Sequence, residues 1–90
     1  MLDVVMLNQF KKDLKLMKKR GLNEKLLSEV VNLLRQQVPL DAKYRDHALT
    51  GDYRGCRECH IQPDWLLIYK IDKENLVLLL IETGSHSDLF

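Results

Sequence analysis

The sequence predicts an α+β domain with two layers, in which a helical hairpin packs on one face of a mostly antiparallel sheet, in the order βααβββ. Three observations predict it. Two segments with helical periodicity come first, three apolar segments of strand length follow, and the 90 residues suffice for one domain. The chain is 46% hydrophobic and 30% charged, which excludes a disordered protein. We expect a single domain over residues 1–90.

The N-terminal segment predicts a strand and then a helix. Leu2–Leu7 is a short apolar run with two valines, which favours a strand. Asn8 is expected to cap the helix that follows. From Gln9 to Arg20 apolar residues recur at helical spacing between lysines, and Gly21 is expected to end the helix.

A second helix is expected directly after the first. Asn23 is its predicted N-cap, and a wide apolar stripe extends from Glu24 to about Gln37. Pro39 ends it. Since only a Gly-Leu-Asn connection separates the two helices, they are expected to form an antiparallel hairpin.

The second half of the chain predicts a long loop and three strands. The loop, Asp41–Gly55, is polar and rich in turn-forming residues, and loops of this length are commonly functional or disordered. The expected strands are Cys56–Gln62, Trp65–Ile71 and Leu76–Ile81, and the last is apolar enough to be covered on both faces. Glu82–Phe90 forms a tail.

The net charge of +1 hides a strong asymmetry. Residues 1–45 carry ten Lys or Arg against five Asp or Glu, a net charge of +5, whereas residues 46–90 carry four against eight, a net charge of −4. The basic first helix could contact phosphate groups, or it could be an ordinary solvated helix face. The basic half therefore suits a polyanion.

Membrane and secreted classes are excluded by the sequence pattern. No apolar run approaches the roughly 18 residues of a membrane span, and the N-terminus does not resemble a signal peptide. We therefore expect a cytoplasmic protein with reduced thiols. Cys56 and Cys59 supply at most half of a zinc site, and an offset of three on a strand directs them to opposite faces. At least one is expected in the core, and no metal or other cofactor is expected.

Three histidines are the strongest chemical feature. They are His47 in the loop, His60 near the end of a strand and His86 in the tail, and Asp64 follows His60 across a proline turn. If the sheet brings them together, they form an acid–base cluster, and otherwise they are scattered surface residues. Trp65 could stack on an unpaired RNA base, whereas core packing is at least as plausible for Tyr69.

Two stretches resemble a known family. They are DHALTGDYRGCRECHIQPDWLLIY (Asp46–Tyr69) and TGSHSDLF (Thr83–Phe90), and they closely resemble the YafQ-type toxins of the RelE/ParE superfamily. This resemblance implies a RelE-like fold and the toxin of a bacterial type II toxin–antitoxin system. Such toxins are ribosome-dependent mRNA endonucleases that cut in the A site. They have an antitoxin partner that wraps around them.

The resemblance also implies an active site. The matching positions are His47, His60, Asp64, His86 and Phe90. A 2′-hydroxyl of the RNA attacks the adjacent phosphate, so one group accepts a proton and another protonates the leaving oxygen. His60 or Asp64 is expected to be the base and His86 the acid. No metal is required, because the nucleophile belongs to the substrate.

Roles for the remaining two positions follow from the same resemblance. His47 would position or stabilise the phosphate, and Phe90 would orient the RNA base.

One position departs from the family pattern. Glu82 stands where the family normally has an arginine that stabilises developing negative charge, so weak cleavage is expected. Either this is a natural variant that uses Arg54 or Arg57 instead, or it is an inactivated form.

The charge pattern then predicts an RNA-binding surface, which an acidic antitoxin segment could share. It comprises Lys11, Lys12, Lys15, Lys18, Lys19, Lys43 and Arg45, with Arg54, Arg57 and Trp65 nearer the active site. We expect a monomer when free and a heteromer with antitoxin. The alternatives are a ParE-like gyrase inhibitor, which would lack the histidine set, and a catalytically impaired binding module.

Overall fold

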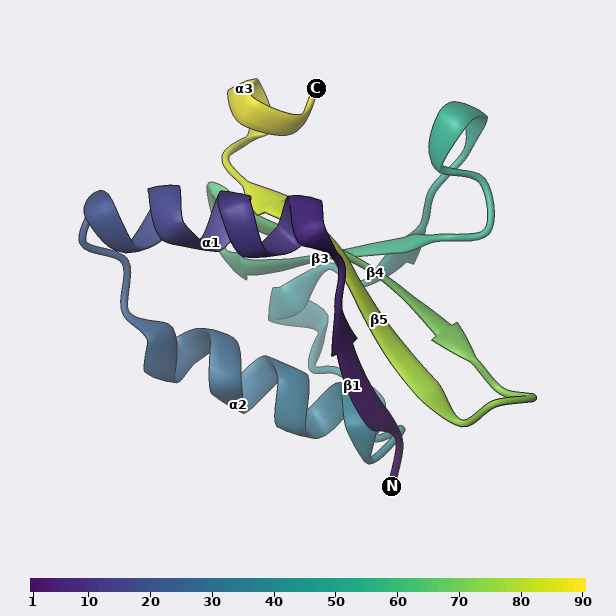
Figure 1. Ribbon diagram of the computed structural model, residues 1–90. Coiled ribbons are helices and arrows are strands. Elements are labelled where there is room, and N and C mark those ends of the chain that lie inside the picture. Colours follow the sequence, from purple (N-terminus) through teal and green to yellow (C-terminus); the bar gives the residue numbers. More distant parts are fainter.

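The computed structural model describes residues 1–90 and contains one five-stranded sheet with two long helices on one face (Figure 1). The strands are β1 (Asp3–Met6), β2 (His47–Ala48), β3 (Arg57–Gln62), β4 (Trp65–Asp72) and β5 (Val77–Gly84). Their order across the sheet is β1-β5-β4-β3-β2, and only the β1–β5 pair is parallel. The predicted α+β class with a mostly antiparallel sheet is confirmed.

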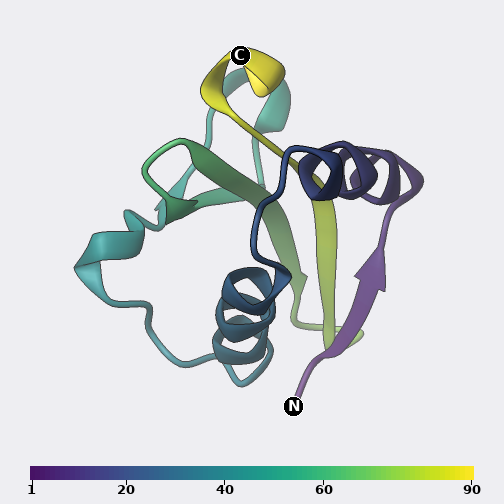
Figure 2. The same cartoon turned by 90° about the vertical axis from the view of Figure 1, so that its left-hand side faces the viewer.

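The two long helices form the expected antiparallel hairpin. Helices α1 (Asn8–Lys19) and α2 (Glu24–Arg35) lie on the same side of the sheet, and Figure 2 views both nearly end-on. The side chain of Asn23 accepts from the backbone N–H of Lys25, so this predicted cap is confirmed. The prediction for Asn8 is wrong. Leu7 flanks the helix instead, because its N–H still bonds to β5 at Leu80 while its carbonyl already accepts from Lys11.

The second helix ends earlier than the sequence predicts. Its last residue is Arg35, and Gln37 has a left-handed φ of 57°. The N–H of Val38 bonds to the carbonyl of Leu33, which closes the helix end before Pro39. The helix therefore ends through a backbone turn, two residues before the limit that its apolar stripe suggested.

The hydrophobic core lies between the helices and one face of the sheet. Its buried members include Phe10 and Met17 of α1, Val30 and Leu34 of α2, and Cys59, Trp65, Leu67, Tyr69, Leu78 and Leu80 of the sheet. Burial raises the pKa of the Cys59 thiol to about 12. The expectation that β5 is covered on both faces is wrong, because Val77, Leu79 and Ile81 on its other positions are only half-buried.

The long loop and the tail contain structure that the sequence did not predict. The loop contains the 3₁₀ turns η1 (Ala42–Tyr44) and η2 (Gly51–Tyr53) and, between them, the edge strand β2. The observed strand count is therefore five rather than four. In the tail, β5 continues to Gly84, and the short helix α3 (His86–Leu89) follows it at the end of the sheet remote from the N-terminus (Figure 1).

Two β-bulges change which face the strand ends present. On β3, Ile61 is the extra residue between the pairs His60–Leu66 and Gln62–Trp65. On β5, Ile81 is the extra residue between the pairs that Leu80 and Glu82 form with β4. Strict alternation would place Glu82 on the helix side with Leu78 and Leu80. The bulge places Thr83 there instead and directs Glu82 to the opposite face.

Candidate active site

The sheet register collects polar residues on the face away from the helices. One row across the strands contains His47 of β2, Glu58 of β3, Ile68 of β4 and Glu82 of β5, and the next contains His60, Leu66 and Gly84. Leu66 and Ile68 are fully buried and form an apolar floor between the polar strands. α3 and the η2 loop border this face. We call the polar residues here, together with Asp64 and His86, the candidate site.

Asp64 and His86 form a hydrogen-bonded pair at one end of the candidate site. Oδ1 of Asp64 lies 3.0 Å from the backbone nitrogen of His86 and 2.9 Å from its Nδ1. These contacts, the backbone N–H first, hold the pKa of Asp64 below its usual value. A carboxylate only accepts, so Nδ1 of His86 carries a proton and Nε2 remains available. The His60 ring is edge-on to the His86 ring, 5.4 Å between centroids.

Glu58 connects the other two histidines. Its side chain is only 6% exposed, and its Oε1 lies 3.6 Å from Nε2 of His47 and 3.4 Å from Nε2 of His60. Nδ1 of His47 donates to the carbonyl of Arg45 at 2.7 Å, so Nε2 is the atom that faces Glu58. Glu58 is a residue of the candidate site that the sequence pattern did not single out. The signal was its spacing of two from His60, which places both on one face of a strand.

Glu82, Tyr53 and Phe90 form a second contact group at the site. The hydroxyl of Tyr53 donates to Oε2 of Glu82 at 2.8 Å, and this hydrogen bond raises the pKa of Tyr53 to about 12. The Tyr53 ring meets the Phe90 ring edge-on, with centroids 5.7 Å apart. Phe90 is 62% exposed. Glu82 therefore holds the tyrosine that contacts Phe90.

Neither arginine proposed as a substitute is seen to pair at Glu82. Arg57 shares strand parity with Cys59 on the helix-side face, and its guanidinium bonds to Asp46, with Nη2 at 3.3 Å from Oδ2. These contacts raise the pKa of Arg57. The expectation that Arg57 serves the site is wrong, because it points to the other side of the sheet. Arg54 is exposed and adjacent to Tyr53 in sequence.

The expectation that Trp65 stacks on RNA is wrong. Its side chain is 1% exposed, and its Nε1 donates to Oγ1 of Thr83 at 2.9 Å. Thr83 in turn donates to the carbonyl of Leu66 at 2.7 Å, so the indole belongs to a closed, buried network. Tyr69 is buried in the core, as the alternative predicted. The only exposed aromatic ring beside the candidate site is Phe90.

Two contacts attach the short helix α3 to the body of the protein, and a capping box closes its first turn. Ser85 and Asp88 form a reciprocal capping box, and Arg20 at the end of α1 binds both carboxylate oxygens of Asp88. Gly84 is required by close approach, since a Cβ there would lie 2.9 Å from Cβ of Asp88. With the Asp64 contact, these interactions fix where α3 presents His86.

The whole chain matches known toxins. The model of the family described as the bacterial toxin of type II toxin–antitoxin system, YafQ, matches residues 2–90. The chain belongs to the YafQ toxin family. It is 39% identical over 89 residues to the mRNA interferase toxin YafQ of Escherichia coli K12, a match that covers 98% of this chain and 95% of that one. The membership predicted from the motifs is confirmed.

Solved structures of similar toxins share the fold over the full chain. A metal-bound toxin from Helicobacter pylori is 47% identical, with a TM-score of 0.94 and complete coverage of both chains. YafQ in the E. coli DinJ–YafQ complex is 38% identical, with a TM-score of 0.89 over 100% of this chain and 99% of that one.

This YafQ-family chain has no group of three His, Cys, Asp or Glu side chains arranged to hold a metal. It also has no helix long and apolar enough to cross a bilayer.

Seven of the cations predicted to bind RNA in this YafQ-family chain lie on two surfaces. Lys11, Lys12, Lys15, Lys18 and Lys19 are exposed on α1, and Lys43 and Arg45 are exposed in and after η1. Among the lysines of α1, Lys18 pairs with Glu24 at 2.9 Å. The η1 residues are closer to the catalytic candidates, because the carbonyl of Arg45 accepts from the ring of His47.

Proposed function

We propose that this chain is the toxin of a type II toxin–antitoxin system that cleaves ribosome-bound mRNA in the A site and is neutralised by a cognate antitoxin. One observation carries the proposal: His86 is oriented by Asp64, with its Nε2 available, beside the ring of His60. Two imidazoles side by side suit the two proton transfers of RNA cleavage. The E. coli relative is named an mRNA interferase, which supports the same activity.

In the proposed reaction the RNA supplies its own nucleophile. The 2′-oxygen attacks the adjacent phosphorus as His60 accepts the hydroxyl proton. The bond from phosphorus to the 5′-oxygen breaks, and His86, which enters this step with a proton on each ring nitrogen, donates the proton on Nε2 to that leaving oxygen. The products are a 2′,3′-cyclic phosphate and a 5′-hydroxyl. This mechanism requires no metal, because the nucleophile is part of the substrate.

The surrounding residues hold these two imidazoles. Asp64 is assigned a positioning role rather than that of the base, because its Oδ1 already accepts two hydrogen bonds from His86. Glu58 faces Nε2 of His60, which leaves the Nδ1 edge of that ring for the substrate. His47 stands on the other side of Glu58, where it would contact the phosphate, and Phe90 would stack on an RNA base.

Glu82 is expected to weaken this activity. A carboxylate and a phosphate charge about 4 Å apart repel by about 4 kcal/mol at an effective dielectric constant near 20, before screening. This supports slow cleavage by the chain as written. It is also the observation that favours the second candidate function, a binding module for antitoxin or nucleic acid that cleaves little.

RNA and antitoxin would use the basic surfaces. The exposed lysines of α1 and the pair Lys43 and Arg45 suit ribosomal RNA, with an affinity that falls with salt. An acidic antitoxin segment could contact the same cations, and the DinJ–YafQ complex of E. coli supports a protein antitoxin. A cytoplasmic location follows if the ribosome is the target.

The test is cleavage of a defined mRNA in a bacterial translation extract, with mapping of new 5′-hydroxyl ends. We expect slow A-site cleavage that depends on ribosomes, that disappears in His86→Gln and that the control Lys73→Ala retains. No cleavage by the parent chain or by Glu82→Arg would reject the nuclease and favour the binding module. Inhibition of DNA gyrase without RNA cleavage would favour the ParE-like alternative.

A further inference from the structure

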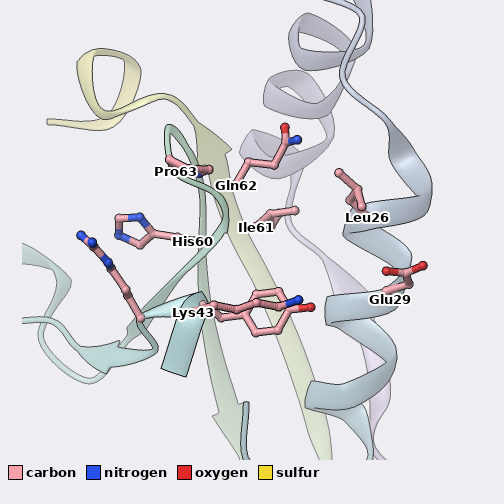
Figure 3. Close-up of a pocket in the computed structure, with 9 residues that line it drawn as sticks. Leu26, Glu29, Lys43, His60, Ile61, Gln62 and Pro63 are labelled. Atoms are coloured by element: carbon pink, nitrogen blue, oxygen red, sulfur yellow. The ribbon is translucent and has the colours of Figure 1, made fainter. Parts of the chain in front are cut away.

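A cavity of about 470 Å³ lies beside the candidate site, between α2 and β3. Figure 3 shows Leu26 and Glu29 projecting from α2 toward β3, where Ile61 and Gln62 form the facing wall. His60 lines the same cavity from the other side of the strand. Because β2 pairs with β3 only as far as Glu58, no strand covers this part of the sheet edge.

The lining combines three kinds of chemistry. Leu26 and Ile61 provide an apolar surface for the flat face of a base. The amide of Gln62 and the carboxylate of Glu29 can bind donors and acceptors on the edge of a base. Lys43, whose Nζ lies 5.1 Å from the centre of the Tyr44 ring, provides a cation for a phosphate. Arg45 adds a second cation, so the cavity carries more positive than negative charge.

We propose that this cavity binds one nucleotide of the RNA substrate, the neighbour of the nucleotide whose 2′-hydroxyl attacks. The inference rests on the proposed function, and it adds a base-recognition pocket to it. His60 connects the cavity to the candidate site, because it lines the cavity and its ring also contacts the ring of His86. A phosphate between these two imidazoles would direct an adjacent, unstacked base toward Gln62.

The first experiment measures binding without cleavage. Backbone amide shifts of the full chain are followed by NMR during titration with 5′-AMP, CMP, GMP, UMP and an uncleavable 2′-O-methyl hexanucleotide. We expect the amides of Leu26, Ile61 and Gln62 to shift, with one nucleotide preferred. Lys43→Ala and Gln62→Ala should each weaken hexanucleotide binding about 5- to 10-fold. Lys43→Ala should also lower the salt slope by about one.

The controls are Lys25→Ala and Lys73→Ala, which remove exposed lysines outside the cavity. They should leave the cavity shifts and the affinity unchanged. Shifts confined to α1, no shifts with any nucleotide probe, or equal losses in the controls would overturn the proposal. Larger cavity shifts with a hexaglutamate peptide would also overturn it, because they would assign the cavity to an acidic protein segment.

Cleavage mapping separates this inference from the proposed function. Cavity shifts without any mRNA cleavage would leave the pocket in place and reject the nuclease. If mRNA is cleaved, Gln62→Ala should raise the KM and redistribute the cut sites while its kcat changes little. The same cut sites and KM in Gln62→Ala would overturn the pocket and leave the nuclease in place. Gln62 is exposed at a strand end, so this variant is expected to fold.

Discussion

Nδ1 of His86 lies 2.9 Å from Oδ1 of Asp64, although 22 residues separate them in the chain. The same oxygen accepts from the backbone N–H of His86, so one carboxylate orients both the ring and the first turn of α3. Asp64 is exposed in the turn between β3 and β4, so its contact with His86 joins this turn to α3 and is not part of the core. Its removal should therefore change chemistry more than stability.

Asp64→Asn is expected to slow cleavage about 10²- to 10⁴-fold, because the amide no longer favours the Nδ1–H form of His86. The measurement is the single-turnover rate on ribosome-bound mRNA as a function of pH. Asp72→Asn is a matched control, because Asp72 also accepts several hydrogen bonds within a turn but lies at the far end of β4. A normal rate and pH profile for Asp64→Asn would remove it from the mechanism.

Glu82→Arg is expected to raise cleavage about 10- to 1000-fold, since it replaces repulsion of the phosphate by attraction. The change also removes the acceptor of the Tyr53 hydroxyl. Tyr53→Phe is the matched control, because it removes the hydrogen bond and leaves the charge. Equal rates for the parent chain and Glu82→Arg would contradict an electrostatic role for this position.

Acid should release α3 from the body of the protein. Arg20, followed by the N–H and hydroxyl of Ser85, lowers the pKa of Asp88. A lowered pKa means that this stabilisation is complete above the ordinary aspartate value of about 4 and is lost as pH falls below it. Amide exchange of Leu89 and Phe90 should therefore accelerate, relative to core amides, between about pH 4 and pH 2. In Asp88→Asn the same two amides should exchange fast at every pH.

Protection that stays unchanged down to pH 2, while the core remains folded, would show that Asp88 does not fix α3. Arg20→Gln provides a second check, since it removes the partner without changing the carboxylate. It should raise exchange in α3 at neutral pH.

Gly84→Ala should displace α3, because the new Cβ would lie 2.9 Å from Cβ of Asp88, which is too close without a shift of the helix. We expect a loss of about 1–3 kcal/mol in the free energy of unfolding, measured in urea. The cleavage rate should fall by more than the loss of folded protein explains, because His86 moves with α3. Ser28→Ala, at an exposed position of α2, should change neither. Unaltered cleavage in Gly84→Ala would show that α3 tolerates the displacement.

Much of the fold could be predicted because periodicity is a local signal. The two amphipathic helices, the Asn23 cap and four of the five strands follow from side-chain spacing and turn residues. The strand β2 has only two residues, which is too short to show the alternation of apolar and polar side chains typical of a strand. The sequence pattern therefore does not distinguish it from the surrounding loop. The α3 helix is held by Arg20 and Asp64, which are distant in sequence, and its four residues would not form a helix alone.

The candidate site was only partly predictable for a different reason. Histidines are conspicuous in any sequence, whereas Glu58 becomes meaningful only when the register places it between His47 and His60. An aromatic residue beside histidines resembles a stacking platform for RNA, which is why the sequence pattern favours that role for Trp65. Nothing local indicates that Thr83, across the sheet, accepts a hydrogen bond from its indole.

The bulge at Ile81 makes the function of β5 depend on residue count as well as residue identity. If Ile81 were instead an ordinary paired residue in regular alternation, the two faces would be exchanged for the rest of the strand. Glu82 would then enter the core beside Trp65, and Thr83 would take its place on the open face. One extra residue in the backbone ladder therefore sets the phase of the chain, and with it which of Glu82 and Thr83 faces the candidate site.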